Sequence, residues 1–351
     1  MQARLLAWWD AGHRALPWRY PQGEADPYRV WLAEAMLQQT QVSVVIPYYR
    51  RFLSRFPSIE ALAQASEEEV LALWSGLGYY ARGRHLRAAA REALARYGRL
   101  PASREALCRL PGFGPYTAGA VASIAFALQV PCVDGNAARV LSRLFLVEGA
   151  LGEAKTRREL WSLAGSLVPA DRPGDFNQAL MELGATVCGR HAPRCRRCPL
   201  APGCAARRAG RQAAIPVSRP RQKPVRLEMA CAVVEGRDGL LLARRPFGGL
   251  FGGMWELPSA VVPAGEDGRT VLRRALRERL SLRVVPGPVL ASLCRVLTHR
   301  RLHLVAYRCQ ARLPAWREHL LFVPRGSTKS LALPRAMQAL IDELHRLGSP
   351  A

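Results

Sequence analysis

Four closely spaced cysteines constrain the fold of this chain more than any other feature of its sequence. They are Cys188, Cys195, Cys198 and Cys204, with the spacing C-x6-C-x2-C-x5-C inside 17 residues. Four thiolates so close in sequence can surround one metal centre. Zinc ribbons usually carry two C-x2-C pairs and this segment has one, so the spacing favours an iron–sulfur cluster over zinc. Arginine, proline and histidine between the cysteines argue against a buried helix or strand.

The chain carries many more cations than anions. Its 51 Lys and Arg residues against 27 Asp and Glu give a net charge of +24, and the basic residues are spread along the sequence. The charge therefore belongs to folded surfaces, and nucleic acid is the first expected partner. A codon bias toward arginine would explain the preference for Arg over Lys, but not the excess of cations.

Cysteine usage and hydropathy indicate the compartment. An odd count of nine cysteines in a long chain argues for a reducing cytoplasm and against a disulfide framework. The N-terminus lacks the apolar core of a secretory signal, and no apolar run reaches the roughly 18 residues of a membrane span. We expect a cytoplasmic, nucleoid-associated protein of bacterial type, without a membrane and as a monomer.

The spacing of apolar residues divides the chain into three regions. Residues 1–208 have helical periodicity, 209–226 are polar, basic and proline-bearing as in a linker, and 227–347 form a small α/β unit. In the last region, Met229–Glu235 and Leu240–Arg244 flank a glycine-bearing turn and predict a hairpin. Residues 301–309 alternate as a strand does. The stretches with helical spacing are 28–55, 67–74, 84–97, 103–128, 136–147, 157–167, 269–280 and 333–347.

A glycine-rich turn between two helices predicts a phosphate site. Residues 107–126 read L-C-R-L-P-G-F-G-P-Y-T-A-G-A-V-A-S-I-A-F, a helix-hairpin-helix pattern. Gly112 and Gly114 let backbone N–H groups approach a phosphate, and the following helix N-terminus favours the anion. Asp134 follows Gly114 by 20 residues. It is either a helix N-cap or a functional carboxylate, and capping would keep it ionised.

A single acid lies in the apolar stretch W-L-A-E-A-M-L-Q-Q-T-Q-V. Glu34, Gln38 and Gln41 fall at positions i, i+4 and i+7 and would share one helical face. A solvated polar stripe is the alternative. Because Glu34 is the only charge and apolar residues flank it closely, we expect its pKa to be raised.

Together these segments resemble the helix-hairpin-helix, iron–sulfur DNA glycosylases, and more closely their MutY adenine glycosylase branch. The resemblance covers 1–208 densely and 227–347 loosely. It implies a mainly α N-terminal catalytic domain with an iron–sulfur loop, one 4Fe-4S cluster held by the four cysteines, and a smaller α/β Nudix-like C-terminal domain. The motifs that carry it are W-L-A-E-A-M-L-Q-Q-T-Q-V, G-L-G-Y-Y-A-R, L-P-G-F-G-P-Y-T-A-G-A, V-D-G-N, F-N-Q-A-L-M-E-L-G and the cysteine spacing.

The resemblance also implies residue roles. Glu34 matches the family's catalytic acid and Asp134 its catalytic aspartate, with Tyr116 and Asn136 beside the sugar. Endonuclease III relatives have a nucleophilic lysine where this chain has Tyr116, and residues 1–154 contain no lysine. Base removal without strand cleavage is therefore expected.

Further positions are implied to contact DNA. Gln38 and Tyr79 match residues that wedge into the base stack, and Gln178 matches a position near the adenine. Thr298 and His299, in L-T-H where the family often shows F-S-H, are the expected contacts to 8-oxoguanine. For Tyr79 helix packing is the alternative, and for Thr298 and His299 a turn without a ligand.

The C-terminal segment G-G-L-F-G-G-M-W-E-L-P resembles the Nudix-like domain of MutY proteins. Its next predicted helix carries Glu278 as the only acid, so magnesium-dependent hydrolysis is not expected. The expected partner is duplex DNA with adenine opposite 8-oxoguanine or guanine. The alternatives are a bifunctional glycosylase/lyase acting on oxidised pyrimidines and a non-catalytic iron–sulfur DNA-binding protein.

Overall fold

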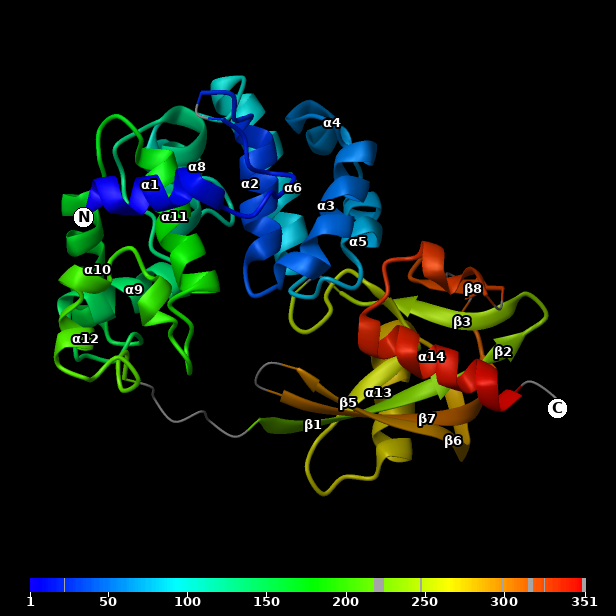
Figure 1. The fold of residues 1–351 in the computed structure, drawn as a ribbon. Coiled ribbons are helices and arrows are strands. Elements are labelled where there is room, and N and C mark those ends of the chain that lie inside the picture. Colours follow the sequence, from blue (N-terminus) through cyan, green and yellow to red (C-terminus); the bar gives the residue numbers. More distant parts are fainter. Residues whose placement is uncertain are drawn as a thin grey trace. The chain divides into compact units, whose positions relative to one another are not determined.

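The computed structural model describes residues 1–21, 23–217, 224–246, 248–297, 300–314, 318–324 and 326–348. The chain forms two compact units (Figure 1). One combines Met1–Ala65 with Arg84–Pro220, and the other combines Ser66–Gly83 with Arg221–Ala351. Within the described ranges, none of the helices is long and apolar enough to cross a membrane.

The first unit is helical, which confirms the predicted class. Several of its helices begin at a capping serine, such as Ser58 and Ser103, whose side chains accept from backbone N–H groups. Its elements are α1 (Gln2–Gly12), α2 (Pro27–Leu37), α3 (Val42–Arg55), α4 (Ile59–Gln64), α6 (Ala81–Tyr97, whose first residues belong to the second unit), α7 (Arg104–Cys108), α8 (Pro115–Phe126), α9 (Gly135–Phe145), α10 (Ala154–Leu167), α11 (Pro173–Thr186), η1 (Cys195–Arg197), η2 (Ala201–Gly203) and α12 (Ala205–Arg208).

Helices α8, α9 and α11 pack against one another in the centre of this unit. Small residues permit the close approach. A Cβ at Gly184 on α11 would lie 2.7 Å from the Cβ and from the carbonyl oxygen of Asn136 on α9. The close packing brings the start of α9, which follows Asp134, next to the last turn of α11.

The predicted continuous helix over 28–55 is wrong, because the chain turns after Leu37. Gln39 has φ +58°, and the amide of Gln38 donates to Thr117 Oγ1 at 3.0 Å. Gln38 and Gln41 therefore do not continue the helical face of Glu34. The apolar period misled the prediction because α2 and α3 each bury one face.

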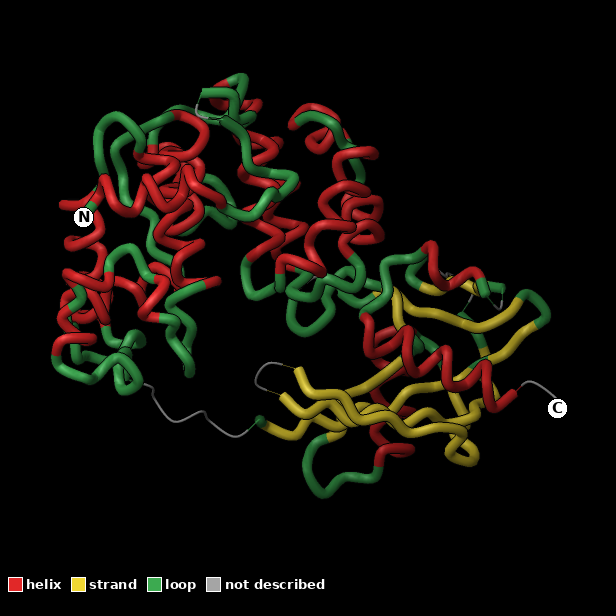
Figure 2. Tube along the Cα trace, viewed as in Figure 1, coloured by secondary structure: helices red, strands yellow, loops and turns green. Residues whose placement is uncertain are grey.

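The strands, drawn in yellow in Figure 2, belong to the second unit, which is built around a four-stranded sheet. The order of this sheet is β5-β1-β7-β6, and β1 and β7 run parallel. Alternate residues of β1 face α14 (Met229, Cys231, Val233) and α13 (Ala230, Ala232). A second sheet joins β2, β3 and β4, and β8 pairs with β3. The elements are α5 (Glu67–Trp74), β1 (Val225–Val233), β2 (Glu235–Gly236), β3 (Gly239–Arg244), β4 (Trp255–Glu256), β5 (Ser259–Val262), α13 (Gly268–Leu280), β6 (Arg283–Leu297), β7 (Arg300–Arg312), β8 (Leu320–Val323), η3 (Ser327–Ser330) and α14 (Arg335–Gly348).

The predicted hairpin is present only as a short remnant. Glu235 pairs with Leu240 and Gly236 with Gly239, but the residues before them enter the other sheet as β1. The apolar side chains on the two faces of β1 pack against two helices, and β1 does not form the predicted hairpin with β3. The strand predicted at 301–309 is confirmed within β7.

The compact units do not follow the predicted domain limits in two places. Ser66–Gly83 packs with the second unit, although it lies inside the predicted domain 1–208. The start of the predicted linker 209–226 packs with the first unit, because Ile215 is buried and its carbonyl accepts from Arg143 at 2.7 Å. One apolar residue in a polar segment was the signal for that packing.

Candidate active site

Glu34 is a buried carboxyl on α2. The helix begins at Pro27, and the Asp26 side chain caps it by accepting from the N–H groups of Tyr28 and Arg29. Seven other residues of α2 are buried with Glu34, whose exposure is 6%. Burial raises the pKa of Glu34 to about 7; the hydrogen bond from Tyr116 opposes the shift and the charge of Asp134 adds to it. The expected raised pKa is therefore confirmed.

Tyr116 bonds directly to the catalytic-acid candidate. It lies in the first turn of α8, after Pro115, and its hydroxyl donates to Glu34 Oε2 at 2.5 Å. Burial, followed by the charge of Glu34, raises the pKa of Tyr116 well above its ordinary value, so the phenol stays neutral. It acts as a fixed donor that favours the ionised form of Glu34.

Asp134 caps α9. Its Oδ1 accepts from Ala137 N at 2.7 Å, and its Oδ2 accepts from Asn136 Nδ2 at 2.8 Å. The capping interpretation is therefore confirmed. Capping does not conflict with a catalytic role. Burial nevertheless raises the pKa of Asp134, and the two hydrogen bonds only partly offset that increase. Capping was expected to keep Asp134 ionised; its hydrogen bonds do lower the pKa, but the effect of burial is larger.

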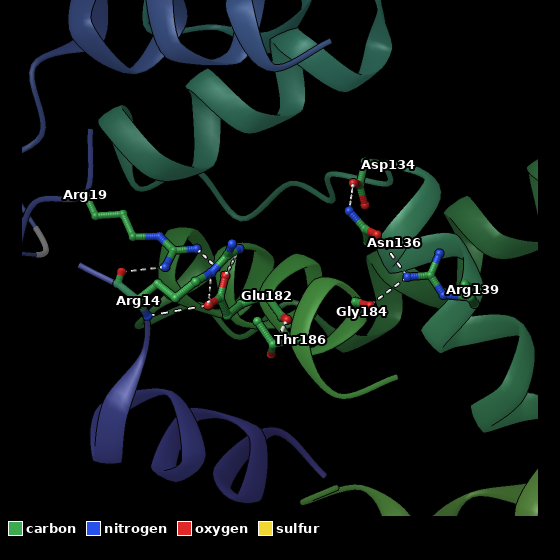
Figure 3. Close-up of polar contacts among 8 residues, drawn as sticks. All are labelled: Arg14, Arg19, Asp134, Asn136, Arg139, Glu182, Gly184 and Thr186. Carbon is green, nitrogen blue, oxygen red and sulfur yellow. Dashed lines mark hydrogen bonds and ion pairs between the residues drawn. The ribbon is translucent and has the colours of Figure 1, made fainter. Parts of the chain in front are cut away.

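A chain of hydrogen bonds links Asp134 to the cysteine loop (Figure 3). Asn136 Oδ1 accepts from Arg139 Nη2 at 2.9 Å, and the same nitrogen donates to Gly184 O at 2.6 Å. Arg139 Nε donates to Cys188 O at 2.8 Å. Sequence analysis assigned no role to Arg139; its position one helical turn after Asn136 was the available signal.

A buried carboxylate on α11, Glu182, forms ion pairs with two arginines. Glu182, 2% exposed, accepts from Arg14 Nε and Nη2 at 2.7 Å each, and from Arg19 Nη2 at 2.8 Å (Figure 3). Burial alone would raise the pKa of Glu182, but the two arginines lower it to about 2. The positive charge of Arg19 also lowers the pKa of Glu34. Gln178 is buried one helical turn before Glu182.

The sequence prediction missed these three charged residues. Arg14 and Arg19 flank L-P-W, and Glu182 lies in F-N-Q-A-L-M-E-L-G. A carboxylate within the apolar stretch A-L-M-E-L-G-A was the signal, because such a group needs a cationic partner from elsewhere in the chain.

Arg143 organises the cysteine loop. The residue is 2% exposed, and its guanidinium donates to the carbonyls of Gly189 at 2.7 Å, Arg190 at 2.9 Å and Ile215 at 2.7 Å. It also lies 3.2 Å from Cys188 Sγ. One side chain thus joins the start of the loop to Ile215, beyond the end of the loop, and brings a positive charge to a thiol.

The four cysteines line one cavity and form no disulfide. Burial is the main cause that raises the pKa of Cys198 to about 11, and the three neighbouring cysteines add to this increase. Among the described residues, no three His, Cys, Asp or Glu side chains converge as the ligands of a single ion would. Four free thiols around one cavity, beside buried Arg143, suit the anionic ligand set of an iron–sulfur cluster.

The helix-hairpin-helix turn is built as predicted. Gly112 has φ +77°, and a Cβ there would lie 2.6 Å from His85 Cβ. Gly114 precedes the first turn of α8 with open space around it. The turn therefore leaves open space beside Gly114 at the start of α8.

The structure brings together Glu34, Tyr116, Asp134 and Asn136, and it places Gln38 against α8 through Thr117. Tyr79 lies in the second unit, 40% exposed, with φ +50°. Thr298 and His299 lie outside the described residues.

Two family descriptions match the chain. Residues 32–165 match the HhH-GPD superfamily of base excision DNA repair proteins, and residues 229–343 match the NUDIX domain. A thermostable thymine-DNA glycosylase has a similar structure, with TM-score 0.52 and 29% identity over 59% of this chain and 95% of that chain. The fold and the site thus define a helix-hairpin-helix repair protein with an appended Nudix-type domain.

Sequence relatives narrow this class. The rat protein named adenine DNA glycosylase is 38% identical over 355 residues, which cover 86% of this chain and 69% of the rat protein. The human protein of that name is 39% identical over 81% of this chain, and the Arabidopsis thaliana protein 36% identical over 85%. The chain belongs to the adenine DNA glycosylase family, as its motifs predicted. It spans 61% of the human and 55% of the Arabidopsis protein.

Proposed function

We propose that this protein is a monofunctional adenine DNA glycosylase that removes adenine paired with 8-oxoguanine or guanine in duplex DNA. The observation that carries the proposal is a pair of carboxyls, one buried and one half-buried. Glu34 has a pKa of about 7 and hydrogen-bonds to Tyr116, and Asp134 is held by the start of α9 and by Asn136. One carboxyl can be neutral while the other is anionic, as glycosidic bond cleavage requires.

The proposed reaction begins with extrusion of the adenine from the duplex, since its glycosidic bond is unreachable inside the stack. Neutral Glu34 donates its proton to N7 of adenine, the C–N bond breaks, and its electron pair leaves with the base. Ionised Asp134 stabilises the resulting sugar cation. Water then adds to the anomeric carbon, and Glu34, now a carboxylate, takes the proton from that water. Gln178 contributes to the adenine pocket.

A turnover assay tests this function. Duplexes carrying adenine opposite 8-oxoguanine, guanine or thymine are incubated with the protein under single-turnover conditions. Adenine release is expected with the first two and not with thymine. Glu34→Gln should bind the same duplexes and release no adenine, because an amide cannot supply the proton. Full activity in that variant would remove Glu34 from its role.

The absence of lysine from residues 1–154 supports base removal without a covalent lysine step. Borohydride treatment during turnover is therefore expected to trap no protein–DNA adduct. Endonuclease III tested in parallel is the positive control. A trapped adduct would favour the bifunctional alternative, and binding without any base release would favour the non-catalytic one.

We also propose one 4Fe-4S cluster on Cys188, Cys195, Cys198 and Cys204. The cluster, when bound, would cross-link the loop into a rigid body; Arg143 would offset part of its negative charge. Iron and acid-labile sulfide analysis should give about four of each per chain. Cys198→Ser should lower the iron content, whereas Cys108→Ser, at an exposed cysteine outside the loop, should not. Zinc in place of iron would contradict the assignment.

DNA recognition is proposed to involve both predicted domains, 1–208 and 227–347. Gly112 and Gly114 would offer N–H groups to a phosphate, and Gln38 and Tyr79 would fill the stack beside the extruded base. Thr298 and His299 would read 8-oxoguanine. Replacing both with Ala should reduce the preference for 8-oxoguanine over guanine opposite adenine, while the excision rate at saturating enzyme changes little.

A further inference from the structure

The turn that carries Tyr79 has an unusual backbone. Gly76, Gly78 and Tyr79 have φ values of +98°, +77° and +50°. Glycine adopts this region freely, but tyrosine does not, so the conformation at Tyr79 has to be maintained by surrounding contacts. Tyr79 is also 40% exposed, so burial of its ring does not explain why the turn keeps this shape.

Neighbouring side chains fix part of the turn. Trp74 Nε1 donates to Gly78 O at 3.2 Å, and the Arg82 guanidinium donates to the same carbonyl at 3.2 Å. Arg82 lies 5.3 Å from the centre of the Tyr79 ring and 5.6 Å from that of Trp74. These contacts orient the Tyr79 ring, but all come from residues 74–82 and cannot anchor that segment as a whole.

The anchor comes from residues more than 170 positions later in the chain. Before the turn, Ser75 Oγ donates to Leu333 O at 2.6 Å. After it, the Tyr80 hydroxyl accepts from Arg335 N at 3.3 Å. The two anchors therefore bracket Tyr79 and join it to the start of α14.

Two further contacts extend this anchor. Trp255 Nε1 donates to Glu68 Oε1 at 2.9 Å, and the ring of Phe251 packs edge-on against that of Tyr80 with centroids 6.4 Å apart. Both Phe251 and Trp255 belong to the Nudix-type segment G-G-L-F-G-G-M-W-E. The segment thus has contacts at α5 and at the turn.

We propose that the Nudix-type part of the second unit positions Tyr79, and that Ser75, Tyr80 and Trp255 are positioning residues for insertion of this ring into the DNA stack. The inference rests on the proposed function, since it takes Tyr79 as the wedge. It adds that the residues reading the opposite base and the ring entering the stack belong to one body. Loss of an anchor weakens DNA binding through Tyr79, without altering the carboxyls that break the bond.

The test is a double-mutant cycle in which the Kd for a DNA duplex is measured for single variants and for the same variants combined with Tyr79→Ala. The duplex carries 2′-fluoro-deoxyadenosine, whose glycosidic bond resists cleavage, opposite 8-oxoguanine, and 2-aminopurine beside that guanine reports unstacking by fluorescence. Ser75→Ala and Trp255→Phe should each raise Kd by about two- to tenfold and reduce the fluorescence increase. In a Tyr79→Ala background the same changes should have no further effect. Single-turnover excision at saturating enzyme should be unchanged.

Ser166→Ala, which removes a serine-to-carbonyl hydrogen bond on α10, is the matched control and should change neither signal. Urea midpoints identify any variant that fails to fold, and Trp255→Phe then replaces Ser75→Ala. Equal loss of affinity with and without Tyr79 would overturn the positioning role alone. No effect of Tyr79→Ala itself would overturn the wedge role on which it rests, while adenine release would still stand.

Discussion

The proton on Glu34 is governed by effects of opposite sign around one side chain. Burial is the largest and favours the neutral acid, and Asp134 adds to it. The Tyr116 hydroxyl and Arg19 favour the carboxylate. The resulting pKa of about 7 lets the group give up a proton and take one back near neutral pH.

The single-turnover rate of adenine release is expected to depend on pH with two limbs. Because Glu34 must be protonated, the rate should fall as pH rises through about 7. Because Asp134 must be ionised and burial raises its pKa above the ordinary value, the rate should also fall on acidification, at a pH above 3.8. Tyr116→Phe removes a hydrogen bond to the carboxylate, so the alkaline limb should move to higher pH. An alkaline limb unchanged in that variant would contradict the role of Tyr116.

Sequence reasoning singled out Glu34 and Asp134 as candidate catalytic carboxyls, but it did not predict their surroundings. A lone acid among apolar residues was sufficient to predict a raised pKa for Glu34. The raised pKa of Asp134 was not foreseen, because a cap motif reveals hydrogen bonds and not burial. Arg14, Arg19 and Glu182 come from distant segments, and their meeting depends on how α11 packs beside the N-terminal residues.

At the scale of elements, local signals predicted turns better than they predicted helix length. The two glycines and Pro115 marked the break between α7 and α8. The break after Leu37 had no glycine or proline to mark it, and it depends on the tertiary hydrogen bond from Gln38 to Thr117.

The two hairpin glycines should differ in their tolerance of a methyl group. Gly112→Ala places a Cβ against His85 at a positive φ, so we expect a loss of stability of about 1–3 kcal/mol. Gly114→Ala meets open space with φ −93° and should change the free energy of unfolding by less than about 0.5 kcal/mol. Urea unfolding measures both. Equal losses would mean that the close approach at His85 does not constrain the turn.

For the whole molecule, periodicity predicted the fold class of each unit, but it did not predict which residues belong to each unit. Apolar spacing predicted helices followed by a small α/β unit. No local pattern marked Ser66–Gly83 as part of the second unit, because its partners Trp255 and Leu333 are far away in sequence.

The net charge of +24 should make DNA binding strongly dependent on salt. The logarithm of the association constant should fall linearly with the logarithm of salt concentration, with a slope of about 0.9 per phosphate contacted. Arg196, exposed in the cysteine loop, is one such candidate. Arg196→Gln should reduce the magnitude of this salt-dependence slope by about 0.9. Arg237→Gln, in the β2–β3 turn of the second unit, is the comparison variant that also loses one positive charge. An unchanged slope for Arg196→Gln would exclude that phosphate contact.

The assignment of Ser66–Gly83 to the second unit has a consequence for synthesis on the ribosome. This segment leaves the ribosome before its partners Phe251, Trp255, Leu333 and Arg335, which are much later in the sequence. The first unit can form its helices around the interruption, but α5 and its turn acquire their hydrogen-bond partners last. Synthesis of Leu333 and Arg335, rather than folding of the residues that precede them, therefore sets when the exposed tyrosine of that turn becomes fixed.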